Sequence, residues 1–429
     1  MRILVEPSAH HLLNMGDVAM LTAAVERLQS VWPQAEVGVI ANDPERLAVH
    51  CPRVTWVPAA GRQCWFDEPY IGARLHRLLP TRLADRVRSI EGSVRRHWPS
   101  IVAASIWARK RLKGKEVEEL RVFLDWVSTA EMIVVVGAGL ITDAFAPLAL
   151  TVLELLETAA LRGATTAMFG QGIGPVTDPR LIAVARRVLP RVDLVCLREE
   201  QAGRAILRSL NVPEDRIVTT GDDTVELAYQ ARATESRGAA IGLSLRVARY
   251  SEVNDGMVSA VGKALRRSAE RFHAELVSLP VSRYWKERDA LVIVAALGLD
   301  ASEADDPETP LELIERIRRC RVVVTGSYHA GVFALAQGIP AIGVAQSQYY
   351  VDKFAGLADQ FAGHCPVVTL DAPALEERLM EVLAELWSRA DDLRPKLLAA
   401  AERQIRARAA AFQTLRDIHT ARTATSATR

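Results

Sequence analysis

The sequence predicts an α/β protein of two domains, each with a parallel β-sheet covered by helices on both faces. Its 429 residues exceed the size of one typical hydrophobic core, so about two domains are expected. Short apolar runs alternate with helical patterns along most of the chain. The alternation pauses at a polar loop around residues 231–238 and then begins again, which indicates a domain boundary.

The first domain is predicted to span residues 1–232. One segment, residues 72–118, interrupts its pattern, and we predict an inserted basic helical segment there. The stretch Gly72–Lys115 holds twelve Arg or Lys residues against only Asp85 and Glu91. Such a segment is commonly a solvated face, and the alternative is docking on an anionic glycan or on lipid headgroups. Seven apolar runs are interpreted as the strands of this domain: Ile3–Glu6, Val37–Ala41, Thr55–Val57, Ile133–Val136, Thr166–Phe169, Leu194–Leu197 and Ile217–Thr220.

The second domain is predicted to span residues 238–371 and to repeat the architecture of the first. Residues 372–429 read as a terminal helical segment. Two such domains that face each other across a cleft make up a glycosyltransferase-B-like arrangement of two Rossmann-like domains. The expected elements of the second domain are the strand Ile241–Leu245, the helix Asp255–Phe272, the strand Glu275–Leu279, the helices Trp285–Leu297 and Pro310–Cys320, and a strand–helix–strand unit within Arg321–Val344.

Composition excludes several classes of protein. The formal net charge is only +1, so nothing global favours nucleic-acid binding. Five cysteines without a CxxC pair suggest neither a disulfide framework nor a zinc site, and we expect no metal. Residues MRILVEP read as a strand rather than a signal peptide, and no uninterrupted run of about 18 apolar residues occurs. We expect a cytoplasmic protein, at most peripheral to the inner face of the membrane.

The strongest candidate site lies in Arg321–Val344, which reads RVVVTGSYHAGVFALAQGIPAIGV. An apolar strand leads to Ser327, a helix begins near Tyr328, and His329 falls in its first turn. Ligands of open α/β sheets bind where the carboxyl end of a strand meets the amino end of a helix. The free N–H groups of that helical turn favour a phosphate or a carboxylate.

Four cationic side chains are expected around His329. Arg198, Arg246 and Arg283 each follow a predicted strand, and Lys353 lies in the first turn of another predicted helix. Guanidinium groups bind carboxylates and phosphates in a bidentate manner, so together they predict an anion pocket. Ordinary salt bridges at the rim of the sheet, and a solvated lysine, are the alternatives.

The first strand–helix junction places Asn14, Gly16 and Asp17 at the start of a helix. Either these residues only cap the helix, or Gly16 lets a ligand approach the backbone closely. Asp222 and Asp223 also follow a strand. Because successive side chains of an extended segment alternate, only one of the two carboxylates is expected to face the site.

Two glycine loops complete the set of candidates. Gly137 and Gly139 follow a buried strand, but the third glycine of a dinucleotide-binding motif is missing, so we expect no cofactor. Gly172 and Gly174 belong to the stretch FGQGIGPVTDP, whose several N–H groups suit an anion or an acceptor sugar. Tight turns are the alternative for both loops.

Taken in order, these motifs resemble the polysaccharide pyruvyl transferase family. The motifs are the N-x-G-D loop at Asn14–Asp17, GAGLITD, GQGIGP, LREEQA, GDD, and TGSYHAGVFALAQGIPAIGV followed by YYVDKF. The resemblance covers nearly the whole chain except the basic insertion and the terminal helix. It implies a two-domain glycosyltransferase-B-like fold with the acceptor on the first domain and the donor on the second. One departure is clear, because family members commonly carry Arg-Leu-His where this chain has Ser327-Tyr328-His329.

The resemblance further implies transfer of a pyruvyl group from phosphoenolpyruvate to a saccharide or lipid-linked saccharide of a cell-surface or exopolysaccharide precursor, giving a pyruvate ketal. His329 is the expected acid, neutral in the empty site and charged with donor bound, and Asp17 or Asp222 would activate the acceptor. Ser327, Tyr328 and the four cations would hold the donor. A sugar-nucleotide glycosyltransferase of the same fold and a non-catalytic saccharide-binding relative remain the alternatives.

Overall fold

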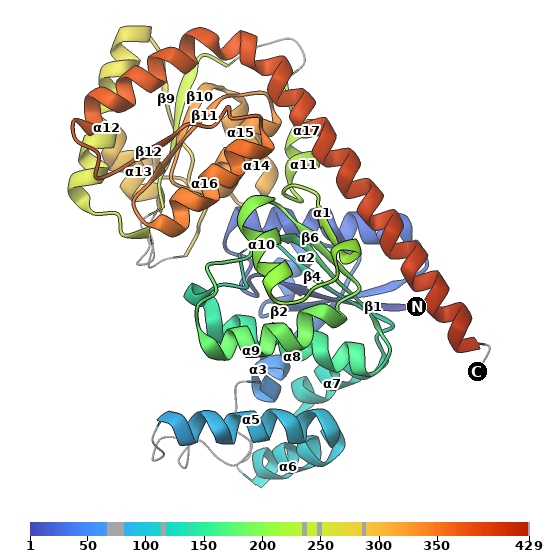
Figure 1. The fold of residues 1–429 in the computed structure, drawn as a ribbon. Helices are drawn as coiled ribbons and strands as arrows, with labels where there is room; N and C mark the ends of the chain where they lie inside the picture. Colours follow the sequence, from blue (N-terminus) through green and yellow to red (C-terminus); the bar gives the residue numbers. More distant parts are fainter. Residues whose placement is uncertain are drawn as a thin grey trace.

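Two parallel β-sheets form two domains in the computed structural model, which describes residues 1–66, 81–112, 117–137, 139–233, 238–246, 251–284 and 289–427. Figure 1 shows the seven-stranded sheet in the lower domain and the five-stranded sheet in the upper one. The predicted architecture of two parallel sheets is therefore observed.

The sheet of the first domain has the strand order β3-β2-β1-β4-β5-β6-β7. Each predicted strand overlaps an observed one, and β1 lies inside the sheet between β2 and β4, as its apolar and fully buried residues Ile3–Val5 require. The strands are β1 (Arg2–Pro7), β2 (Glu36–Ala41), β3 (Thr55–Pro58), β4 (Met132–Val136), β5 (Thr165–Gln171), β6 (Leu194–Leu197) and β7 (Ile217–Thr219). The helices around them are α1 (Met15–Val31), α2 (Pro44–His50), α3 (Ala59–Phe66), α7 (Glu118–Thr129), α8 (Ala146–Leu161), α9 (Pro179–Val188), α10 (Gln201–Ser209) and α11 (Val225–Gln230).

The sheet of the second domain has the strand order β12-β11-β10-β8-β9. Every residue of α15 is buried, as its continuous apolar sequence requires. The edge strand β12 was missed in the sequence, because only three residues form it. The strands are β8 (Ala240–Ser244), β9 (Leu276–Ser278), β10 (Cys320–Thr325), β11 (Ala341–Ala345) and β12 (Val367–Thr369). The helices are α12 (Asp255–Phe272), α13 (Asp289–Leu297), α14 (Pro310–Arg318), α15 (Tyr328–Ala336) and α16 (Gln348–Gln360).

The basic insertion contains two helices, α5 (Thr81–His97) and α6 (Pro99–Leu112), which lie at the end of the molecule away from the second domain (Figure 1). The other predicted parts of the insertion, residues 72–80 and 113–116, fall outside the described residues. Among the described helices, one segment, Asp143–Leu161, is long and apolar enough to cross a membrane. It contains α8, which packs against α9 and β5 as a core helix of the first domain.

The terminal helix α17 (Leu375–Ala427) runs for 53 residues from the second domain back across the first (Figure 1). Trp387 stacks on Phe272 of the second domain, with ring centroids 4.9 Å apart. Phe412 stacks on Phe169 of the first domain at 4.1 Å. The predicted terminal segment thus packs on both domains and holds them together.

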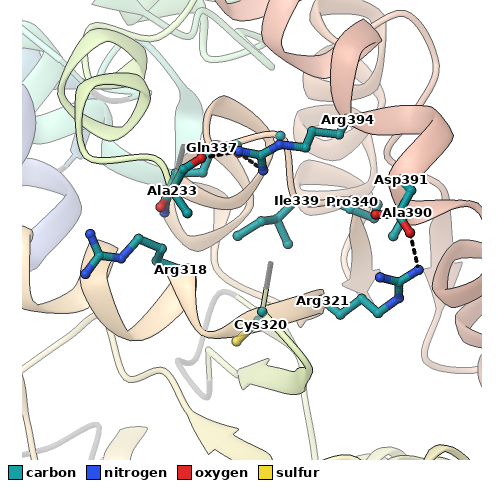
Figure 2. A pocket seen from close by; sticks show the side chains of 12 residues that line it. Ala233, Arg318, Cys320, Arg321, Gln337, Ile339, Pro340, Ala390, Asp391 and Arg394 are labelled. Carbon is teal, nitrogen blue, oxygen red and sulfur yellow. Dashed lines mark hydrogen bonds and ion pairs between the residues drawn. The ribbon is translucent and has the colours of Figure 1, made fainter. Parts of the chain in front are cut away.

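Figure 2 shows how the linker between the domains is fastened to α17. Arg394 donates hydrogen bonds to the carbonyls of Gln337, at 2.9 Å, and of Ala233. Nearby, Arg321 forms an ion pair with Asp391 at 2.9 Å. The hollow between these side chains measures about 30 Å³, room for one or two waters, so it is a structural junction rather than a substrate site.

Candidate active site

A cavity of about 300 Å³ lies between the two domains at the carboxyl ends of the central strands. This is the position where open α/β sheets bind ligands. Both domains line it, and nine of the residues singled out in the sequence are among its walls: Asn14, Asp17, Gly139, Arg198, Arg246, Ser327, Tyr328, His329 and Lys353. Sequence reasoning missed several further lining residues, chiefly Tyr284, Ser8 and Phe145.

His329 lies where the two domains touch. It belongs to the first turn of α15, and its ring packs against Gly16 of α1 so closely that a Cβ on Gly16 would lie 2.0 Å from Nδ1. On the other side of the ring, Nε2 lies 3.7 Å from Oδ2 of Asp222. The imidazole is therefore held between a glycine and a carboxylate, both from the first domain.

Asp222 is fixed by its neighbour Thr224. Its Oδ1 accepts hydrogen bonds from the backbone N–H of Thr224 at 2.9 Å and from the Thr224 hydroxyl at 2.6 Å. Its Oδ2 and Nε2 of His329 are both buried, and neither has a hydrogen-bond partner among the described residues. A carboxylate oxygen and an imidazole nitrogen thus face each other slightly beyond hydrogen-bond distance.

Burial sets the protonation of the two central titratable groups. It lowers the pKa of His329, although the charges of Asp222 and Asp17 oppose the shift. The imidazole of the empty cavity is therefore neutral at neutral pH. Burial raises the pKa of Asp17, opposed by His329 and by a hydrogen bond from Ser8. The raised pKa brings Asp17 closer to neutral pH, whereas the lowered pKa takes His329 further below it. An anion bound in the cavity would raise the pKa of His329 again.

Arg198 enters the cavity from the end of β6 and is 1% exposed. Its Nε forms an ion pair with Glu199 at 2.7 Å, and its guanidinium lies 4.1 Å from the centroid of the Tyr328 ring. Gly172 passes so close that a Cβ there would lie 2.4 Å from Nη2. Among the described residues Nη2 has no hydrogen-bond partner, so it can donate to a bound anion.

Two more cations line the second-domain side. Lys353 on α16 places Nζ 4.1 Å from the centroid of the Tyr349 ring. Burial lowers the pKa of Lys353 strongly, and the charge of Arg198 lowers it further. An anion in the cavity would raise this pKa again. Arg246 forms an ion pair with Asp289 at 3.3 Å.

The domains are joined beside the site by backbone pairing. Asn14 and Ser282 form an antiparallel bridge, in which the N–H of Met15 donates to the carbonyl of Val281 at 2.9 Å. The N–H of Arg283 donates to the carbonyl of Leu13 at 2.8 Å. This pairing lies within two residues of Gly16, and so it fixes α1 against His329.

Six predicted site residues are not among the cavity walls: Gly16, Asp222 and Gly172, which lie against His329 or Arg198, and Arg283, Gly137 and Gly174. Arg283, expected in the anion pocket, instead acts electrostatically on His50 and Asp306. The bridge at Ser282 explains this, because successive side chains alternate and the next residue, Tyr284, takes the cavity side.

Gly137 and Gly174 form turns away from the cavity walls. Both have a positive φ, and they pack against Met20 and Ile206, respectively. The positive φ at these two positions agrees with the backbone-turn alternative for the two loops. Gly139 lines the cavity, and Gly172 packs against Arg198.

Comparison with known families decides the class of this site. Residues 14–348 match the sequence profile of the family described as polysaccharide pyruvyl transferase. The chain belongs to the polysaccharide pyruvyl transferase family. The resemblance read from the motifs is confirmed, and this pyruvyl transferase family member is an enzyme of the transferase class.

Solved structures share the fold of this pyruvyl transferase family member. A Listeria monocytogenes protein assigned as a UDP-N-acetylglucosamine 2-epimerase covers 93% of this chain and 91% of its own, with 11% identity and a TM-score of 0.55. Arabidopsis thaliana UGT89C1 complexed with UDP-L-rhamnose covers 98% of each chain, with 11% identity and a TM-score of 0.53. The UDP-GlcNAc 2-epimerase of Neisseria meningitidis, bound to UDP-GlcNAc, covers 94% and 98%, with 10% identity and a TM-score of 0.51. The glycosyltransferase-B-like fold is confirmed. No curated protein sequence matches the chain.

Proposed function

We propose that the protein transfers a pyruvyl group from phosphoenolpyruvate to two hydroxyls of a saccharide in a cell-surface or exopolysaccharide precursor, giving a cyclic pyruvate ketal and phosphate. One observation carries the proposal. A buried imidazole shares its cavity with the cations Arg198, Arg246 and Lys353. Phosphoenolpyruvate offers the matching chemistry, a carboxylate and a phosphate on a carbon–carbon double bond that needs a proton.

Arg198 is the best replacement for the arginine that family members commonly carry near this histidine. Its guanidinium lies over the ring of Tyr328, the residue just before His329, with a centroid distance of 4.1 Å. A positive charge therefore stands beside the start of α15 although Ser327 and Tyr328 are uncharged. The free Nη2 donates to the carboxylate or phosphate of the donor, and Arg246 and Lys353 bind the remaining negative charge.

The reaction needs one proton donor and one proton acceptor. Donor binding brings negative charge to His329 and raises its pKa, so the imidazole becomes charged and protonates the methylene carbon. The resulting cationic carbon bonds to the first sugar hydroxyl, whose proton passes to Asp17. The second hydroxyl then displaces phosphate and closes the ring. The methyl group keeps the proton from His329, the proton taken up by Asp17 is released and one proton returns to His329 through solvent, and the proton of the second hydroxyl leaves with the phosphate. The reaction therefore balances without a cofactor.

Donor consumption tests this proposal directly. The purified protein is incubated with phosphoenolpyruvate and a panel of oligosaccharides, and released phosphate is measured beside the mass of the glycan. We expect equimolar phosphate and ketal product. In deuterium oxide, one deuterium per product should appear in the ketal methyl group. Phosphate release without ketal formation in any mixture, or a product methyl group free of deuterium, would contradict the proposed chemistry.

A sugar-nucleotide glycosyltransferase is the second candidate, because the structures of similar fold include complexes with UDP-GlcNAc and UDP-L-rhamnose. Against it, residues 327–346 contain no carboxylate, whereas retaining enzymes of this fold often bind the nucleotide sugar with glutamates there. Release of UDP from UDP-sugars, with phosphoenolpyruvate left intact, would favour this candidate. Tight glycan binding without turnover of either donor would favour a non-catalytic saccharide-binding protein.

A further inference from the structure

Exposed apolar side chains gather on the hairpin of α5 and α6. In the described part of the chain, ten large apolar side chains are exposed, and six of them belong to this hairpin although it contributes only residues 81–112. A soluble surface normally scatters such side chains singly, and their concentration marks an interaction site. The six are Leu83, Ile90, Trp98, Ile101, Trp107 and Leu112.

The helix α6 carries apolar side chains on its exposed side as well as on its buried side. Val102 and Ile106 are fully buried and face the rest of the domain. The opposite face is an exposed stripe at helical spacing, which we call the α6 stripe: Ile101, Ala104, Ser105, Ala108 and Leu112. Leu112 is 89% exposed and Ile101 is 59% exposed. An apolar stripe that faces solvent needs a partner.

The hairpin is also strongly basic. Residues 81–112 hold eight Arg or Lys residues and only two acids, Asp85 and Glu91, a formal charge of +6 in a chain whose net charge is +1. No acidic residue occurs in α6, and Arg109 and Arg111 flank the α6 stripe. Of the two acids, Glu91 is buried at 5% exposure. The partner must therefore tolerate both apolar insertion and a dense positive charge.

Ion pairs hold the hairpin in this orientation. Arg95 and Arg96 of α5 pair with Glu154 and Glu157 of α8 at 3.2 and 3.4 Å. These ion pairs hold the inner side of the hairpin against the first domain. Among the described residues, the α6 stripe is exposed.

We propose that the α5–α6 hairpin docks this protein on an anionic lipid bilayer, with the α6 stripe inserted at the level of the headgroups. Exposed aliphatic and tryptophan side chains bordered by Arg and Lys are the composition of helices that lie in a bilayer interface. Anionic headgroups supply the complementary charge. A soluble polyanion would use the charge but leave Ile101 and Leu112 without a role. The proposal does not depend on the donor or on the reaction.

Vesicle co-sedimentation of the full chain tests the docking. Vesicles of equal parts phosphatidylglycerol and phosphatidylcholine should pellet the protein at low salt, and pure phosphatidylcholine vesicles should pellet much less. Added salt should weaken the binding because it screens the headgroup charge. Trp98 and Trp107 should shift their fluorescence to shorter wavelength on binding. Wild-type protein that stays in the supernatant with the anionic vesicles at low salt would overturn the proposal without any variant.

Three double variants locate the contact. Ile101→Ser with Leu112→Ser should abolish most of the binding. Arg109→Ala with Arg111→Ala should weaken partition about 30-fold, since each basic residue near an anionic surface contributes about fivefold. The matched control, Leu291→Ser with Leu311→Ser in the second domain, removes two leucines that are 43% and 47% exposed and should bind like the wild type.

Other partners give different results. Equal losses in the stripe and control variants would overturn the assigned surface. Full binding by the stripe variant with loss in the arginine variant would indicate a polyanion site without insertion. A dimer in solution that the stripe variant dissociates would show that a second copy covers the α6 stripe. Each of these outcomes contradicts insertion of the α6 stripe into a bilayer, and circular dichroism confirms that the variants are folded.

Discussion

The adjacent carboxylates Asp222 and Asp223 have different partners, one at the active site and the other on the terminal helix α17. Asp222 directs Oδ2 at His329 across the domain boundary, with a gap of 3.7 Å. Asp223 directs Oδ1 at Arg408 of α17 and closes an ion pair at 3.0 Å. Both carboxylates are buried, at 3% and 0% exposure. The degree of burial therefore does not distinguish a carboxylate at the candidate site from a structural one. The identity of the partner residue and the distance to it do distinguish them.

Two glycines pack closely beside these carboxylates and their partners. A Cβ on Gly16 would collide with the His329 ring that faces Asp222. A Cβ on Gly170 would lie 2.6 Å from Oδ2 of Asp223, and this glycine also has a positive φ of 61°. A glycine thus packs on His329, the partner of Asp222, and another packs directly on Asp223, the partner of Arg408 in α17.

Removal of the imidazole should have the largest effect on turnover. His329→Ala and His329→Gln are expected to lower kcat by about 10²–10⁴-fold, because a positioned acid contributes that much. Phosphate release from phosphoenolpyruvate measures the change. His364→Ala, a histidine outside the cavity walls, is the matched control and should keep wild-type turnover. Near wild-type rates in both His329 variants would remove this histidine from the chemistry.

The alanine variants of Gly16 and Gly170 are expected to show the next largest difference in turnover. Gly16→Ala should lower kcat by about 10²-fold, because the methyl group displaces the His329 ring and a shift of 1 Å can cost that much. Gly170→Ala should lower stability while turnover per folded molecule stays near that of the wild type. Turnover and urea unfolding of both variants make the comparison. Equal losses of turnover in the two would show that the close packing on His329 has no special role.

Asp222→Asn should have a smaller effect on rate and a diagnostic effect on pH dependence. We expect a loss of about tenfold in kcat, as for a group that positions the acid. The negative charge of Asp222 raises the pKa of His329, so its removal lowers that pKa further. Since the acid must be protonated, the alkaline limb of the kcat profile should move to lower pH. Asp223→Asn is the control, and an unmoved limb in Asp222→Asn would separate this carboxylate from His329.

Arg408→Met should leave turnover per folded molecule nearly unchanged and act on stability. Arg408 binds Asp223, Glu226 at 3.2 Å and the carbonyl of Ala23 at 2.8 Å. Removing one partner of a buried ion pair typically costs about 3–5 kcal/mol. Urea unfolding measures the free energy, and Arg406→Met, an exposed neighbour on α17, should cost much less. A fall in kcat as large as that of Gly16→Ala would mean that the α17 contact belongs to the active site.

Local patterns in the sequence predicted the strands and most helices because both depend on apolar spacing. The helix Asp255–Phe272 and the strand Leu194–Leu197 have the predicted bounds. The unit around His329 was also found in the sequence, since a strand followed by a helix start is a local feature. These elements need no knowledge of distant contacts.

The direction of neighbouring side chains needs long-range contacts and could not be predicted. Alternation indicated that one of Asp222 and Asp223 faces the site, but only the position of α17 decides which one. The same limit explains Arg283, because the bridge between Asn14 and Ser282 sets which of two successive side chains enters the cavity. A shift of one residue in such a pairing exchanges the two faces.

The bridge between Asn14 and Ser282 couples the shape of the cleft to its chemistry. If the cleft widens so that the backbone contacts of Met15 and Arg283 break, Gly16 moves away from the imidazole of His329. Asp222 then also moves away from Nε2 of that ring. In the proposed mechanism, a molecule with a widened cleft is therefore inactive, because the contacts that position His329 as the proton donor are broken. In the proposed mechanism, water that enters a widened cleft would then find no assembled acid, and the proposed donor would be protected from hydrolysis until the two domains close around it.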